Sequence, residues 1–183
     1  MLPRPAAMLA LAIACSSAAL FAQGTPARPD ISGYWELRLD SFNVPRALLT
    51  PAAQSASDAR LKKDLDALRD CVNIGVPALM NDRQTLDIRQ SAGVIGMVAK
   101  SPSSTRYIYT DGRKHPAADE IEGTTNGHSI GRWDGDALLV DTVGFNDRGI
   151  TAIPGGGYRT NRSHLVEEYR LSGGGEQLTV TFT

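Results

Sequence analysis

The chain has 183 residues, and its 19 Lys and Arg against 20 Asp and Glu give a formal net charge of −1. This balance excludes the concentrated basic surface of a nucleic-acid-binding domain, so we expect no nucleic-acid partner. The length fits a single domain with one hydrophobic core.

Residues 1–22 have the pattern of a secretory signal peptide. Arg4 gives a short basic start, and an apolar, alanine-rich stretch follows. We expect cleavage after Ala22 and a periplasmic or extracellular mature protein. The less favoured alternative is a lipid anchor at Cys15, because residues 11–17 loosely resemble a lipobox. No later segment reaches the ~20 apolar residues of a membrane span, so no transmembrane segment is expected.

Signal cleavage would leave Cys71 without a second cysteine, so we expect no intramolecular disulfide. The apolar setting of this thiol over residues 71–80 predicts that it is buried and inert.

Residues 23–30 contain two prolines and no periodic pattern, which predicts a flexible leader before a single domain over residues 31–183. Alternation over residues 31–40 predicts a first strand. Thr50 and Pro51 suit the cap and the first position of a helix, and we expect one amphipathic helix from there to Asp70.

The remainder of the domain is predicted to consist of short strands joined by turns. The expected strands are residues 84–90, 94–99 and 105–110, a hairpin within 126–147, and residues 163–171 and 177–183. Consecutive strands of this kind favour an antiparallel meander. We therefore predict a mainly β fold that closes into a barrel or curled sheet, with one flanking N-terminal helix.

The sequence ends at Thr183, inside an expected strand. Either this is a deliberate final strand or the sequence is a truncated product, and truncation would leave an open sheet edge prone to association.

The hairpin is the most informative segment for function. Asp134-Gly135 predicts a tight type I′ turn, and this loop would place His128 directly opposite Asp141. A carboxylate there can hold the imidazole in one tautomer. A three-residue loop would instead bring Thr142 opposite His128, and a purely structural histidine is the competing explanation.

Glu167 is a second unusual feature, because it shares its strand face with Leu165 and Tyr169. A carboxylate on such a face needs a partner, which we expect to be Arg132 or His128. The alternative is a structural salt bridge inside the curled sheet.

These residues define a candidate site. We expect His128 to act as general base, with Asp141 orienting it and Glu167 as a third catalytic member. The predicted ligand-binding residues are Arg132, Asp111, Arg113 and His164. Residues 111–113 are otherwise a simple turn, and His115 can contribute to the mouth of the site.

The aromatic residues Trp133, Trp35 and Tyr107 are expected in the core. A metal site at His128, Asp141 and Glu167 or His164 is the weakest option, because no His-x-His or His-Glu-x-x-His spacing occurs. The glycine-rich segments lack the strand-to-helix context of a phosphate loop. We expect no metal and no cofactor.

Several motifs together resemble a widespread family of secreted bacterial proteins of unassigned function. They are Ser32 to Trp35, Leu49 to Pro51, Cys71 with Gly75 and Pro77, Tyr109 to Arg113, the Gly-His-Ser-Ile-Gly-Arg-Trp string at Gly127 to Trp133, and His164 to Glu167. Members of this family continue past the last strand, which favours truncation here. The Gly33-Tyr34-Trp35 start also resembles the Gly-x-Trp of lipocalins, which implies a ligand-holding barrel.

The sequence is compatible with three functions. The favoured one is binding of a small polar or amphipathic ligand in a β-barrel cleft. The second is a lyase or hydrolase that uses His128 with Asp141 as acid and base. The third is an envelope interaction protein without a pocket, and the pattern favours no particular oligomeric state.

Overall fold

The computed structural model describes residues 28–38, 49–68, 74–81, 85–99, 104–148, 153 and 157–183. The expected signal peptide, Cys15 and Cys71 lie outside the described residues.

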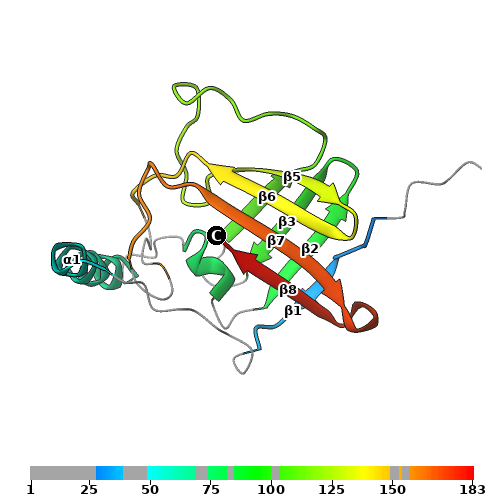
Figure 1. Ribbon diagram of the computed structural model, residues 1–183, viewed down its shortest axis with the longest axis horizontal. Coiled ribbons are helices and arrows are strands. Elements are labelled where there is room, and N and C mark those ends of the chain that lie inside the picture. The colour runs from blue at the N-terminus through cyan, green and yellow to red at the C-terminus, as the bar shows by residue number, and fades with distance from the viewer. Residues whose placement is uncertain are drawn as a thin grey trace, which may run out of the picture.

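Within the described residues, eight strands form one sheet in the order of the sequence (Figure 1). The strands are β1 Gly33–Trp35, β2 Leu86–Ser91, β3 Val94–Ala99, β4 Ser104–Tyr109, β5 His128–Asp134, β6 Ala137–Val143, β7 Leu165–Ser172 and β8 Gln177–Phe182. The sheet curls until it is nearly closed into a barrel, with one seam between its end strands β1 and β8. The predicted fold class, a mainly β curled sheet with a flanking helix, is confirmed.

One junction departs from the expected antiparallel meander. Strands β4 and β5 run parallel, and they pair only at Ile108 with Ser129 and at Tyr109 with Ile130. Parallel neighbours need a crossover connection. Here the crossover is the long segment of residues 110–127, which loops over the top of the sheet in Figure 1 and is named the crossover loop below.

Helix α1, Pro51–Leu68, begins where the sequence predicts it. The Thr50 hydroxyl accepts a hydrogen bond from the Ala53 amide at 3.2 Å, as an N-cap residue does. Its described side chains show no apolar stripe, because Leu61 is 46% exposed and the buried side chain is Asp64. Two short 3-10 helices, η2 Ala78–Asn81 and η3 Gly173–Gly175, complete the described elements, and no described helix is long and apolar enough to cross a membrane.

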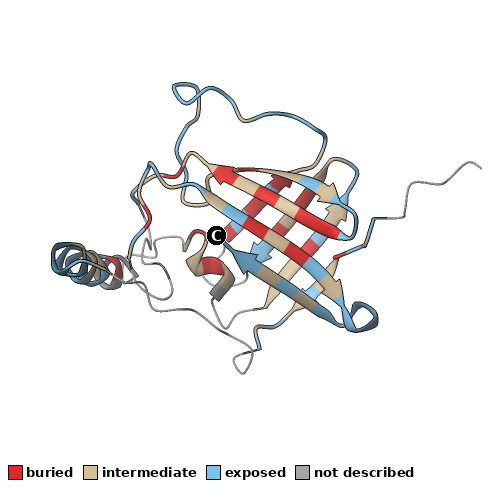
Figure 2. Ribbon diagram, viewed as in Figure 1, coloured by how far each residue is buried: buried red, intermediate tan, exposed pale blue. Residues whose placement is uncertain are grey.

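Buried residues alternate with more exposed ones along the strands (Figure 2), so one set of side chains faces the lumen. The buried cluster there consists of Ile31, Ile88, Ile95, Met97, Ile108, Leu138, Val140 and Tyr169. Trp35 and Trp133 pack against it, as predicted. Tyr107 was predicted in the core and is 56% exposed, because the register places Arg106 inside the sheet and its neighbour Tyr107 outside.

A charged pair completes the lumen. Arg106 and Glu167 are 1% and 0% exposed, and two nitrogens of the guanidinium donate to the two carboxylate oxygens. Arg106 also donates to the hydroxyls of Ser129 at 3.1 Å and Thr142 at 2.9 Å. The Tyr169 hydroxyl donates to Glu167 at 2.8 Å. This pair is the structural salt bridge inside the sheet that was the alternative for Glu167. The prediction that Glu167 pairs with Arg132 or His128 is wrong.

We predict that Glu167→Ala lowers the free energy of unfolding by about 3–5 kcal/mol, because it leaves the Arg106 charge buried without a counter-charge. Chemical denaturation measures this loss. The matched control is Glu168→Ala on the same strand, where the side chain faces outward and pairs with Arg170. Equal losses in the two variants would contradict the burial argument.

Candidate functional site

The β5–β6 hairpin forms with a different register from the predicted one. Asp134, which was predicted in the loop, pairs with Ala137, so the loop is Gly135-Asp136. Gly135 has a φ of 60°, and the first loop position of both common hairpin turns requires positive φ. His128 therefore pairs with Val143, and both expected partners, Asp141 and Thr142, are wrong.

His128 and Asp141 nevertheless share the outer face of the sheet. The loop shifts by one residue on each strand, so the partner of His128 moves by two residues and the side-chain parity is preserved. Asp141 pairs with Ile130, one outward-facing position along from His128. The prediction that these two residues share a face is confirmed, whereas their direct pairing and the placement of Glu167 on the same face are wrong.

All three histidines of the sequence gather around Asp141, in what we call the histidine cluster. His115 Nε2 lies 3.0 Å from Asp141 Oδ1, and His164 Nε2 lies 3.0 Å from Asp141 Oδ2. His128 joins through His115, because their two Nδ1 atoms are 2.8 Å apart. The sequence predicted a direct contact between His128 and Asp141, whereas in the structure His115 connects the two.

The ring of His128 is held from a second side. It stacks on Tyr109 with a centroid distance of 5.4 Å, and the guanidinium of Arg113 lies 3.9 Å from the centroid of the Tyr109 ring. Arg113 is fixed in turn by hydrogen bonds to Asp111. The predicted residues Asp111 and Arg113 therefore form a turn that backs His128 through Tyr109.

The remaining predicted residues divide into two groups. His164 belongs to the histidine cluster. Arg132 is 71% exposed and lies 3.8 Å from Asp134, whereas Glu167 faces the lumen on the other side of the sheet. The sequence placed His115 only near the mouth of the site and did not predict its contact with Asp141. The path of the crossover loop determines where His115 lies.

Burial, and then the charges of His115 and Arg113, hold the pKa of His128 below its ordinary value of 6.5. The ring is therefore neutral at neutral pH, and it can act as an acceptor or a base.

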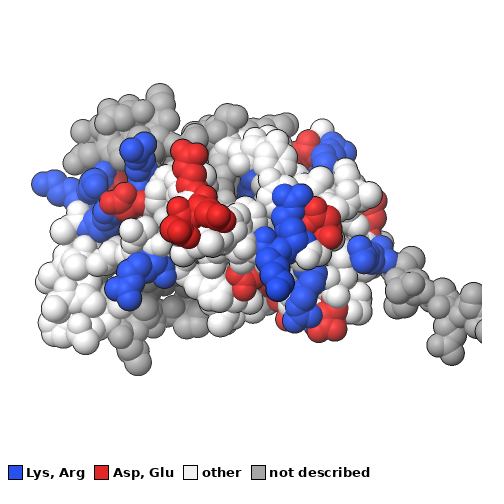
Figure 3. All heavy atoms as spheres, turned by 90° about the horizontal axis from the view of Figure 1, so that it is seen from above, with Lys and Arg blue, Asp and Glu red and all other residues white. Residues whose placement is uncertain are grey.

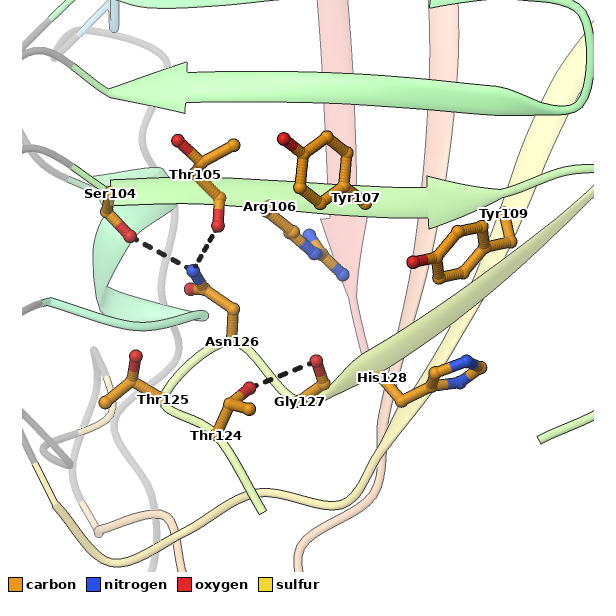
Figure 4. A pocket seen from close by; sticks show the side chains of 10 residues that line it. All are labelled: Ser104, Thr105, Arg106, Tyr107, Tyr109, Thr124, Thr125, Asn126, Gly127 and His128. Carbon is orange, nitrogen blue, oxygen red and sulfur yellow. Dashed lines mark hydrogen bonds between the residues drawn. The ribbon is translucent and has the colours of Figure 1, made fainter. Parts of the chain in front are cut away.

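A cavity of about 330 Å³ lies beside His128. It opens because β4 has no strand partner over residues 104–107 on the β5 side, where the segment 124–128 faces it instead (Figure 4). We call it the β4–β5 cavity. Its lining is rich in hydroxyl groups, with Ser104, Thr105, Thr124 and Thr125 beside Tyr107, Tyr109, Asn126 and His128.

Asn126 partly bridges this gap. Its Nδ2 donates to Ser104 Oγ at 3.0 Å and to the carbonyl oxygen of Thr105 at 2.9 Å (Figure 4). Its Oδ1 is buried and has no hydrogen-bond partner among the described residues. Arg106 also borders the cavity, but its guanidinium is directed to Glu167 in the lumen.

A larger groove of about 790 Å³ lies beside His164, between the crossover loop and the two segments 143–148 and 161–164. Charges of both signs, Arg148 and Arg162 with Glu122 and Asp147, line it. Basic and acidic side chains also lie next to one another on the face shown in Figure 3.

Within the described residues, no group of three or more His, Cys, Asp or Glu is arranged to hold a metal ion. In the histidine cluster the nitrogen and oxygen atoms face one another in hydrogen bonds. Comparisons with family models, curated proteins and solved structures gave no match to this chain.

We predict that stability falls as the pH drops from about 7.5 to about 5, in part because of His128. Its lowered pKa means that the unfolded chain binds this proton more readily than the folded chain, so acidification favours unfolding. Denaturation midpoints across this range, compared between the wild type and His128→Gln, isolate the effect. The variant should lose less stability on acidification, and an unchanged pH dependence would contradict the assignment.

Proposed function

We propose that this protein binds a small, polar, uncharged ligand in the β4–β5 cavity beside His128. The observation that carries the proposal is the buried Asn126 Oδ1, which has no hydrogen-bond partner in the described part of the chain and belongs to a residue that borders the cavity. Buried polar atoms are nearly always hydrogen-bonded, so a ligand or water is expected to complete this one. The volume of about 330 Å³ lies at the lower end of the range for small-molecule sites.

The charges of the lining favour an uncharged ligand. Among the described residues that border the cavity, Arg106 is the one charged residue, and Glu167 neutralises it from the lumen. The rest are hydroxyl, amide, imidazole and aromatic groups, which suit a polar ligand with an apolar face.

The filled lumen also favours a site on the outside. Apolar side chains and the Arg106–Glu167 pair occupy the space in which a lipocalin-like barrel would hold its ligand. The proposed cleft is therefore the gap at the parallel junction, open to the outer surface.

We predict that Thr105→Tyr, which adds a bulky ring at an exposed position bordering the cavity, weakens ligand binding at least about tenfold, or ~1.4 kcal/mol. NMR titration of the full chain with a panel of neutral and charged small polar molecules measures it. Signals of residues 104–109 and 124–128 should shift in the wild type. The matched control is Thr179→Tyr on β8, also exposed. Absence of shifts at the cavity with every probe, or equal binding by both variants, would contradict the proposal.

A second candidate is a hydrolase or lyase in which His128 is the base. The chain Asp141, His115 and His128 favours it, because a carboxylate that orients a histidine is a common feature of acid–base sites.

For this candidate we predict that His128→Ala lowers turnover by about 10²–10⁴-fold, because the proton acceptor is lost. The measurement is the rate on any substrate found by screening ester, amide and elimination substrates, with denaturation of the same variant as control. Stability should change little. A large loss of stability with a proportional loss of rate would instead support a structural histidine.

A further inference from the structure

We propose that Asp141 fixes the position of the proton on His128 through His115, and that the β4–β5 cavity is thereby an acceptor-lined site for a neutral polyhydroxylated ligand. The ligand part of this inference rests on the function proposed above. The position of the proton on His128, set by the chain Asp141, His115 and His128 that we call the relay, does not depend on that function.

The first step is the contact between Asp141 and His115. An ionised carboxylate only accepts hydrogen bonds, so the Nε2 atom of His115, 3.0 Å from Asp141 Oδ1, must carry a proton. A neutral imidazole has one N–H group, so His115 Nδ1 is left as an acceptor.

The second step is the contact between the two Nδ1 atoms, 2.8 Å apart. A hydrogen bond at this distance needs one donor, and His115 Nδ1 cannot supply it. His128 Nδ1 therefore donates, which leaves the Nε2 lone pair of His128 free. This Nε2 atom has no hydrogen-bond partner among the described residues.

Neighbouring groups hold the relay in place. His164 Nε2 lies 3.0 Å from the second oxygen of Asp141, so the carboxylate is fixed from both sides. Tyr109 stacks on the His128 ring at an interplanar angle of 26°. Burial, the largest cause, holds the pKa of His128 below its ordinary value and so disfavours a second proton on this ring.

Asn126 adds a second acceptor of fixed direction. Its Nδ2 donates to the Thr105 carbonyl oxygen, so a flip of the amide would bring two oxygens together and is disfavoured. Asn126 Oδ1 and His128 Nε2 are thus two acceptors on residues that border one cavity. We expect the ligand to bring hydrogen-bond donors to this lining, and neutral hydroxyl groups beside Tyr107 and Tyr109 fit it.

The test of the relay is ¹⁵N NMR of the full chain with labelled histidine at neutral pH, which distinguishes protonated from unprotonated ring nitrogens. We expect His128 to carry its proton on Nδ1. In Asp141→Ala, and independently in His115→Phe, the proton should shift toward Nε2, the usual tautomer of an unconstrained imidazole. The matched control Asp136→Ala also removes one exposed carboxylate and should leave the tautomer unchanged. A wild-type proton on Nε2, or no shift in either variant, would overturn the relay.

The test of the ligand class uses three probes with one ring skeleton: a methyl glucoside, its permethylated form without donors, and a glucuronate. We expect the glucoside to shift the cavity signals and the other two to bind at least about tenfold more weakly. Equal binding by the permethylated probe or the glucuronate would overturn the ligand class. If the NMR test overturns the relay but the neutral probe binds in the cavity, the proposed function stands. If the relay is confirmed but no polar probe binds in the cavity, the proposed function alone is refuted.

Discussion

The guanidinium of Arg106 connects four strands from inside the sheet. It extends from β4 to Ser129 on β5, Thr142 on β6 and Glu167 on β7. Between β4 and β5 the backbone ladder covers only two residue pairs, so side chains in the lumen supply the contacts that the ladder lacks. Removing two charges from water is costly, and such a pair is tolerated because hydrogen bonds satisfy it nearly completely.

The parallel junction that this network spans also creates the candidate site. A parallel pair requires a crossover, and the crossover loop carries His115 onto the outer face, where Asp141 and His128 already lie. The short ladder leaves the first half of β4 without a strand partner on this side, and the β4–β5 cavity occupies that gap. The histidine cluster and the cavity are therefore two consequences of one topological feature.

Local patterns in the sequence predict the fold better than they predict the site. The Thr50 cap, the strands and the tight turn near Gly135 depend on neighbours in the chain, and each is found close to its expected position. Face parity also held for His128 and Asp141. The partners of His115 and Glu167 depend on which strands become neighbours, and no local pattern indicates that β4 and β5 run parallel.

Intermolecular NOEs from the O-methyl group of a bound methyl glucoside test most directly whether ligands bind outside the lumen, at the parallel junction. Binding there should give NOEs to the ring protons of Tyr109 and His128, which border the cavity. NOEs to the methyl group of Met97, which is fully buried in the lumen, would contradict it.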